Sequence, residues 1–219
     1  SARVLDGAKR MKVVGRYGVG VDNIDVEAAT DLGIAVTYVP DYCVDEVSDH
    51  VMAFLLAFNR RVVIFDNTTK RNGWGSLELN LPMTRLRGLT IGVVGFGRIG
   101  RATARKASAF GLKILVADPF VESKDVTEVD AQLVDLNSLL SESDFVTLHS
   151  PLNEDTRGMI GAAEFEKMKK DAFLINCARG GIYDEEALAD GLESGKLAGV
   201  ALDVFSTEPC TESRLFGMP

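Results

Sequence analysis

The feature that most constrains the fold is a glycine-rich turn between an apolar strand and a helix. The sequence GFGRIG at residues 95–100 has the spacing GxGxxG, follows the apolar run TIGVV and opens a helical pattern near Ile99–Phe110. Gly95 permits a tight turn, Gly97 lets a diphosphate approach the backbone, and Gly100 allows the helix to pack close to the strand. The context predicts a βαβ unit that binds a dinucleotide, whereas the glycines alone would indicate only a tight turn.

The residues after these glycines indicate which nucleotide binds. Arg98 and Ile99 open the helix, where backbone N–H groups and the positive end of the helix dipole favour phosphates. Asp118 closes the next predicted strand about 20 residues on, where this fold places the acceptor for ribose hydroxyls. A carboxylate repels a 2′-phosphate, and the following Pro119 and Phe120 supply no arginine. The sequence therefore predicts NAD rather than NADP.

Strand and helix patterns alternate from residue 89 onward. The predicted strands are apolar without regular alternation, as in parallel strands covered on both faces, and they are Leu89–Val94, Lys113–Ala117, Phe145–Leu148, Ala172–Asn176 and Val200–Val204. The helical patterns between them lie near Ile99–Phe110, Leu136–Leu140, Ala162–Met168 and Glu185–Ser194, with Asp184 as an N-cap and Gly111 and Gly195 as stops. This predicts an α/β fold with a doubly wound parallel sheet of the Rossmann type.

The first part of the chain has a different pattern. MKVVGR and GIAVTYVP are strand candidates joined by a glycine loop. A helical pattern then runs from about residue 45 to 70 with the apolar stripe Val47, Val51, Phe54, Leu55, Phe58 and Val62. We expect residues 1–44 to be the remnant of a second domain and residues 45–219, with this long helix, to form the nucleotide-binding domain. His50 lies within the helix, where we expect a structural role.

Charge and composition argue against several classes of function. The net charge is −8 with both signs interspersed, which favours neither nucleic acid nor an anionic membrane as a partner, and no apolar run could cross a bilayer. Cys43, Cys177 and Cys210 form no CxxC pair, and the two histidines have no ligand spacing, so we expect neither a disulfide framework nor a metal site. A reducing cytoplasm is the expected location.

Five blocks occur in a characteristic order, namely YGVGVDNID, GFGRIG, LHSPLNEDT, NCARGGIYDEEAL and GVALDVFSTEP. From about Val13 to Pro219 the chain thereby resembles the D-isomer-specific 2-hydroxyacid dehydrogenases. The resemblance implies NAD-dependent oxidation of a D-2-hydroxy acid, or reduction of the 2-oxo acid, by a homodimer. It also implies that the second, smaller domain is flavodoxin-like.

The resemblance has more than one branch. YGVGVDNID and ESRLFGMP are most similar to the D-3-phosphoglycerate dehydrogenases, which makes 3-phosphoglycerate the first expected substrate. PDYCVDEVSDH resembles the related corepressors, which bind NAD and peptide partners. Another 2-hydroxyacid or glyoxylate reductase is a further alternative.

The resemblance assigns substrate-binding roles. Arg179 follows an apolar strand at the edge where ligands bind, and it is implied to hold the substrate carboxylate, the alternative being a solvated loop arginine. Glu208 is implied to orient a catalytic histidine, the alternative being a turn glutamate before Pro209. The backbone N–H groups of Val19 and Gly20 are implied to face the substrate carboxylate, unless the loop is a plain turn.

It assigns the nucleotide pocket in the same way. Asp203 resembles the residue that contacts the nicotinamide carboxamide, with a strand-end cap as the alternative. His149 and Pro151 are implied to line the adenine side, so His149 is not expected to be a base. Cys177 and Ala178 are implied to line the pocket, and Cys177, without an activating base, is expected to be a small buried filler rather than a nucleophile.

The family's catalytic histidine follows the glutamate by some tens of residues, beyond Pro219, and further strands and helices precede the position of Ser1. We therefore expect the chain to be a fragment that binds NAD but turns over poorly, because losing a general acid–base typically costs about 10²–10⁴ in rate.

Overall fold

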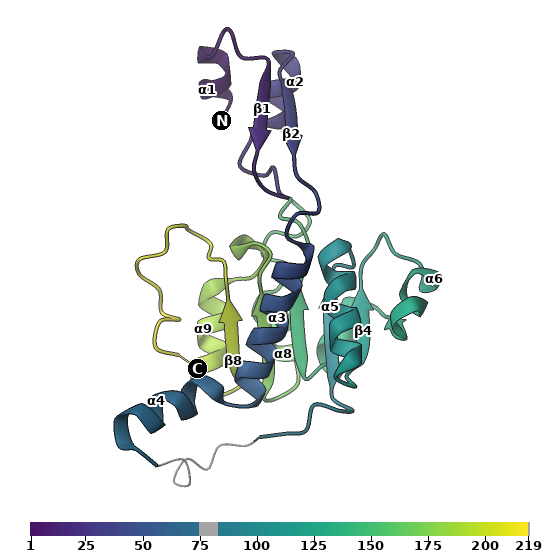
Figure 1. The fold of residues 1–219 in the computed structure, drawn as a ribbon, viewed down its shortest axis with the longest axis vertical. Coiled ribbons are helices and arrows are strands. Elements are labelled where there is room, and N and C mark those ends of the chain that lie inside the picture. The colour runs from purple at the N-terminus through teal and green to yellow at the C-terminus, as the bar shows by residue number, and fades with distance from the viewer. Residues whose placement is uncertain (75–82, 219) are drawn as a thin grey trace. The chain divides into compact units, whose positions relative to one another are not determined.

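The computed structural model of the chain describes residues 1–74 and 83–218. They form two compact units, Ser1–Val44 and Asp45–Pro219, each with its own parallel sheet (Figure 1). In the described part of the chain, no helix combines the length and the apolar character needed to span a membrane.

The first unit is a small α/β layer. Its two strands, β1 (Val13–Arg16) and β2 (Ala35–Tyr38), pair in parallel, and they coincide with the two strand candidates in this part of the chain. The helices α1 (Ala2–Gly7) and α2 (Val26–Asp31) accompany them, and the buried residues of this unit are Leu5, Ala29 and Ile34.

The second unit is built on a six-stranded parallel sheet in the order β5-β4-β3-β6-β7-β8. Its strands are β3 (Thr90–Val94), β4 (Lys113–Ala117), β5 (Ala131–Leu133), β6 (Phe145–Leu148), β7 (Ala172–Asn176) and β8 (Leu197–Leu202). The chain winds outward from β3 through β4 to β5, and then returns to place β6 on the other side of β3. In open α/β sheets, ligands bind at the carboxyl ends of the two strands on either side of such a reversal, which here are β3 and β6.

Helices cover both faces of this sheet, which confirms the predicted doubly wound fold. They are α3 (Val44–Asn59), α5 (Arg98–Ala109), α7 (Leu136–Glu142), α8 (Ala162–Lys167) and α9 (Glu185–Glu193). Ile91 and Val93 of β3 pack with α3 and α5, whereas Val94 belongs to the core under α7, α8 and α9. Figure 1 shows α3 and α5 on the near side of the sheet. Because side chains alternate along a strand, covering both faces requires an apolar run rather than an alternating one.

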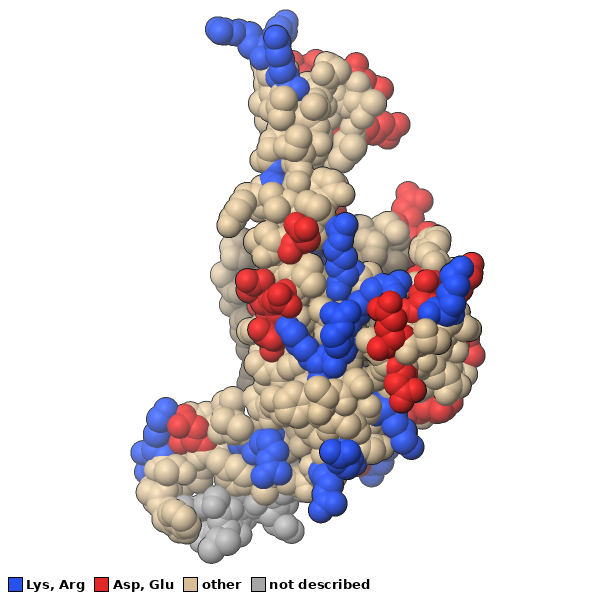
Figure 2. Space-filling model, turned by 45° about the vertical axis from the view of Figure 1, so that its right-hand side comes forward, with Lys and Arg blue, Asp and Glu red and all other residues tan. Residues whose placement is uncertain are grey.

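Lys106 joins the two helices on the near face. Its Nζ lies 2.6 Å from an Asp49 carboxylate oxygen and 3.6 Å from one of Asp45, both on α3. Figure 2 shows that basic and acidic side chains are interspersed over the face that comes forward there.

The long helix predicted from about residue 45 to 70 is wrong as a single element. The structure forms α3 (Val44–Asn59) and α4 (Val62–Asn72), separated at Arg61, which adopts the left-handed conformation with a φ of 54°. The Asn59 side chain donates to the Thr84 carbonyl at 3.0 Å and accepts from the Thr84 hydroxyl at 3.1 Å. These bonds fix the end of α3 to the segment before β3.

The apolar stripe ends where α3 ends. Val51 and Leu55 are fully buried, and Phe58 stacks on Phe173 of β7 with ring centroids 3.7 Å apart. Val62, by contrast, is 54% exposed, and no residue of α4 is buried.

Four short elements are also present among the described residues of the second unit. None of them was predicted from the sequence, and they are α6 (Ser123–Val126), the 3₁₀ turn η2 (Thr127–Val129), the edge strand β5 and the 3₁₀ turn η3 (Gly180–Ile182). The predicted N-cap of α9 is confirmed, because Asp184 accepts from the N–H groups of Glu186 and Ala187 at 3.0 Å each.

Candidate functional site

The glycine turn follows β3 at the carboxyl edge of the sheet, beside the end of β6. Gly95 has a φ of 90°, and a side chain there would come within 2.8 Å of the backbone of His149 and Ser150. The His149 N–H donates to the Val94 carbonyl at 2.7 Å. The ends of β3 and β6 are therefore in direct contact, and only a glycine fits at position 95.

The other two glycines shape the start of α5. A side chain on Gly100 would overlap the Gly95 carbonyl, so its absence lets the helix approach the turn. Gly97 is the N-cap and has no side chain to occupy the first N–H groups, and a methyl group there would meet no described atom within 4 Å. Arg98 and Ile99 form the first helical positions. This open, glycine-bounded helix start fits a diphosphate.

Asp118 stands directly after β4 at the same edge. One carboxylate oxygen accepts from the Phe96 N–H at 2.7 Å, and the other accepts from the Phe120 N–H at 2.9 Å. Each oxygen of a carboxylate can accept a second hydrogen bond. The side chain is thus fixed beside the turn and keeps acceptor capacity for two ribose hydroxyls.

His149 contributes a neutral ring to this edge. Burial lowers the pKa of His149 from its usual 6.5 to about 4, so the imidazole is uncharged at physiological pH. Its Nε2 lies 3.0 Å from the Thr147 hydroxyl, in a hydrogen bond whose direction depends on the tautomer. Pro151 follows in the chain, and the adjacent Leu152 lies 3.2 Å from where a side chain on Gly181 would begin.

Asn176 organises the turn after β7, although the sequence alone did not identify it. Its buried side chain donates to the Arg179 carbonyl at 2.8 Å and accepts from the Ala178 N–H at 2.9 Å, and its carbonyl accepts from the Asp203 N–H at 3.0 Å. One fully buried amide thereby sets the path of Cys177 to Arg179. The signal that could have revealed it is a polar residue that closes an otherwise apolar strand.

Arg179 lies on this turn at the carboxyl edge of the sheet. Its Nη1 donates to the Ala178 carbonyl at 2.7 Å, which directs part of the guanidinium back onto the turn. A side chain on Gly180 would overlap the Phe205 carbonyl, and the Ser206 hydroxyl lies 3.5 Å from the Gly180 carbonyl. The loop after β8 therefore rests on the turn that carries Arg179.

Glu208 lies on that loop and is exposed. Its Oε1 accepts from the Phe205 N–H at 3.1 Å. The Tyr183 hydroxyl donates to the Val204 carbonyl at 3.3 Å, which fixes the start of the loop.

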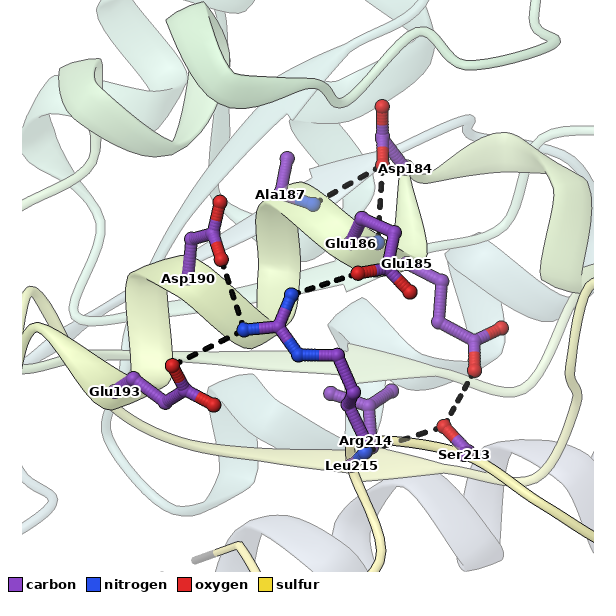
Figure 3. A network of polar contacts seen from close by, with 9 residues as sticks. All are labelled: Asp184, Glu185, Glu186, Ala187, Asp190, Glu193, Ser213, Arg214 and Leu215. Carbon is purple, nitrogen blue, oxygen red and sulfur yellow. Dashed lines mark hydrogen bonds and ion pairs between the residues drawn. The ribbon is translucent and has the colours of Figure 1, made fainter.

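The far end of the loop is attached to α9 by charge (Figure 3). Arg214 pairs with Glu186 at 2.7 Å, Asp190 at 2.9 Å and Glu193 at 3.0 Å. The Ser213 hydroxyl also donates to a carboxylate oxygen of Glu185. A network around one guanidinium holds a segment better than isolated surface pairs do.

Asp203 follows β8 at the same edge of the sheet, close to Cys177. Burial, and secondly the charge of Asp203, raises the pKa of the Cys177 thiol to about 12, so the thiol stays protonated. Asp203 also lies near the first turns of α3, with 3.8 Å between its Oδ1 and Nε2 of His50.

Val19 and Gly20 belong to the first unit, in the loop after β1. The Arg16 Nε donates to the Gly20 carbonyl at 3.3 Å, and the N–H of Val39 donates to the Gly18 carbonyl at 3.2 Å. These bonds use carbonyl oxygens of the loop and hold it against the ends of β1 and β2.

Across residues 1–74 and 83–218, no three histidine, cysteine, aspartate or glutamate side chains gather in a way that could hold a metal ion. The carboxyl edge of the six-stranded sheet instead gathers helix-start N–H groups, a carboxylate, a guanidinium and uncharged walls. This set suits an anionic nucleotide and a small anionic substrate.

Comparisons with known proteins agree with this set. Residues 52–219 match the D-isomer specific 2-hydroxyacid dehydrogenase, NAD binding domain. The chain is 41% identical over 208 residues to a D-3-phosphoglycerate dehydrogenase of Archaeoglobus fulgidus, which covers 95% of this chain and 39% of that protein. It is 42% identical over 218 residues to a glyoxylate reductase of Thermococcus litoralis, which covers 97% of this chain and 66% of that protein.

The chain is also similar to a solved structure of a D-lactate dehydrogenase. The D-lactate dehydrogenase of Aquifex aeolicus, in complex with NAD and lactic acid, superposes with a TM-score of 0.89 at 35% identity, over 95% of this chain and 62% of that one. The chain thus spans 39% of the length of the Archaeoglobus relative and about two thirds of the other two proteins.

Proposed function

Because the chain belongs to the D-isomer specific 2-hydroxyacid dehydrogenase family, we propose that the protein is an NAD-dependent oxidoreductase that acts on the CH–OH group of a D-2-hydroxy acid. The observation that carries the proposal is the composition of one sheet edge. Asp118 beside the glycine turn suits the nucleotide, and Arg179 on the turn after β7 suits a carboxylate.

The nicotinamide ring of the cofactor would supply the hydride acceptor. The residues of the chain bind the cofactor and the substrate and orient them. The start of α5 holds the diphosphate, and Asp118 accepts from the ribose hydroxyls. His149 and Pro151 line the adenine side, and Cys177 and Ala178 line the rest of the pocket. Their uncharged side chains place no competing charge beside the nucleotide.

The substrate is held by charge and by backbone donors. In the second unit, Arg179 is proposed to bind the α-carboxylate. In the first unit, the N–H groups of Val19 and Gly20 are proposed as donors to a carboxylate. Glu208 keeps Oε2 available, since only Oε1 accepts from Phe205. We assign that oxygen to the imidazole of the family's catalytic histidine, which exchanges the hydroxyl proton.

For the substrate we propose 3-phosphoglycerate first, with glyoxylate and D-lactate as the other candidates. The Archaeoglobus relative is named a D-3-phosphoglycerate dehydrogenase, whereas other similar proteins are named a glyoxylate reductase and a D-lactate dehydrogenase. A panel of these acids with NAD, and of the matching oxo acids with NADH, decides among them. No turnover with any of them, together with peptide binding, would favour the corepressor branch.

The cofactor assignment has its own experiment, which uses the 219-residue chain alone. Isothermal titration of NAD into this chain should release heat with 1:1 stoichiometry, and NADP should bind more weakly because Asp118 repels its 2′-phosphate. Absence of heat with NAD would overturn the assignment.

We also propose residues 1–44 as part of the substrate domain, residues 45–219 as the NAD-binding domain, and a homodimer. Support for the dimer comes from α4, whose Val62 and Val63 are 54% and 61% exposed, and from Trp74, which is 90% exposed. Light scattering should give twice the chain mass, and Val63→Asp should give the monomer. A wild-type monomer would contradict this proposal.

A cytoplasmic location is part of the same proposal. Cys43, Cys177 and Cys210 are all free thiols, which suits a reducing compartment. Fractionation of cells followed by immunoblotting tests it.

A further inference from the structure

His50 of α3 faces the carboxylate of Asp203, which follows β8 at the carboxyl edge of the sheet. The His50 Nε2 lies 3.8 Å from the Asp203 Oδ1. The imidazole packs edge-on against Phe54, one turn along α3, with ring centroids 4.2 Å apart and an interplanar angle of 62°. Phe54 in turn packs against the buried core of this face. The ring is therefore supported on one side and directed at the carboxylate.

The backbone of Asp203 is fixed, but its side chain depends on this contact. The Asp203 N–H donates to the Asn176 carbonyl at 3.0 Å, which sets the strand end. The side chain is 57% exposed, and among the described residues His50 is its sole ion-pair partner. The nearby Cys177 thiol is protonated and brings no opposing charge. An aspartate at such a position can occupy several χ1 rotamers unless a partner selects one.

We propose that His50 is a positioning residue, which holds the Asp203 carboxylate in the orientation that receives the nicotinamide carboxamide of NAD. The inference rests on the proposed function, in which Asp203 meets the nicotinamide end of the cofactor. In this proposal the orientation of the Asp203 side chain is set by a residue of α3, the helix that begins at the boundary between the two units in the sequence. His50 touches no part of the nucleotide in this proposal and acts only through Asp203.

A positioning role predicts a loss confined to one end of the ligand. NAD and ADP-ribose share the adenosine, the diphosphate and the second ribose, but only NAD has the carboxamide. Exposed ion pairs of this kind change an equilibrium by about twofold to fivefold. Removing the imidazole should therefore weaken the binding of NAD by that factor and leave the affinity for ADP-ribose unchanged.

The experiment is calorimetric titration of NAD and of ADP-ribose into the chain of residues 1–219. His50→Phe keeps an aromatic ring against Phe54 but removes the N–H, whereas His50→Gln keeps a donor and should restore most of the NAD affinity. Asp203→Asn should reproduce the His50→Phe loss, and the double variant should lose no more than either single variant. Asp49→Asn, on the neighbouring position of α3 and paired with Lys106, is the matched control and should change neither titration.

The outcomes separate this inference from the proposed function. A wild-type chain that binds neither ligand overturns both. Equal weakening of NAD and ADP-ribose in His50→Phe would show a general structural role and overturn the inference alone. So would a wild-type chain that binds the two ligands equally well, or an unchanged NAD affinity in His50→Phe. If His50→Phe unfolds, as circular dichroism would reveal, Asp203→Asn and His50→Gln still decide the matter.

Discussion

The carboxylate of Asp118 accepts a hydrogen bond from the backbone N–H of Phe96 at 2.7 Å, so the end of β4 holds the glycine turn at the end of β3. Asp118 thus has a structural partner in the turn and, in the proposed function, a ligand partner in the ribose. The two roles respond differently to substitution.

Asp118→Asn should lower the affinity for NAD by about 10- to 100-fold, because hydrogen bonds to a charged group contribute roughly 1.5–3 kcal/mol. The turn should persist, since the amide oxygen still accepts from the Phe96 N–H, while the bond from the Phe120 N–H is lost because an amide nitrogen does not accept. The preference for NAD over NADP should shrink, because no charge opposes the 2′-phosphate. Titration calorimetry with both nucleotides measures this, with the exposed Glu128→Gln as the control. An unchanged NAD affinity would remove Asp118 from the site.

Alanine at Gly97 and alanine at Gly100 should give opposite results. Gly97 has open space around it, so Gly97→Ala should cost only about 1 kcal/mol of stability, as expected at an N-cap, while its methyl group blocks the diphosphate. Gly100→Ala overlaps the Gly95 carbonyl and should cost about 1–3 kcal/mol. Urea denaturation and NAD titration on both variants provide the test. Full NAD affinity in Gly97→Ala would mean that the phosphates bind elsewhere.

The Cys177 thiol should resist alkylation. With a pKa of about 12, its thiolate fraction at pH 8 is about one in ten thousand. Iodoacetamide followed by peptide mass spectrometry should therefore label Cys177 far more slowly in the folded protein than in urea. Equal rates in the two states would show that the thiol is neither buried nor influenced by Asp203.

The stability should depend on pH through His149. An unfolded histidine titrates near 6.5 and the folded one near 4, so between these values the unfolded state binds more protons. The free energy of unfolding should have its full value above pH 6.5. It should fall by up to about 3 kcal/mol as the pH drops to 4. His149→Gln, which keeps a polar partner for Thr147 but does not titrate, should flatten this part of the curve. Urea titrations at a series of pH values measure it, and parallel curves for the two proteins would rule His149 out as the cause.

The strands were largely predictable because burial on both faces leaves a local trace. β4, β6 and β7 begin and end where their apolar runs do, since every position of β6 and β7 is buried. β5 was missed because it has three residues at the sheet edge, with an exposed Gln132 at its centre. An edge strand has too little buried surface to mark the sequence.

The break between α3 and α4 was not predictable from the helical pattern. It depends on the bonds between Asn59 and Thr84, which are 25 residues apart, rather than on a local glycine or proline. The role of Asn176 in the turn after β7, and the role that we propose for His50, were not visible in the sequence for a related reason. The partners that give them a role, Arg179 across a turn and Asp203 at a distant strand end, are brought close only by the fold.

The glycine turn, by contrast, stood out in the sequence because two of its positions, Gly95 and Gly100, must lack a side chain for local reasons, while Gly97 completes the spacing. The ligand roles assigned to Arg179, Glu208, Val19 and Gly20 remain predictions.

The carboxyl edge of the six-stranded sheet also bears on how the domain folds. The candidate site residues there lie at 95–100, 118, 149–151 and 176–179, so no contiguous stretch of the chain can bring them together, and the parallel crossovers between them must close first. Nucleotide affinity is then a property of the finished domain alone. A ligand that binds only this form should raise the thermal midpoint in proportion to the logarithm of its concentration, which makes the nucleotide a probe of complete folding.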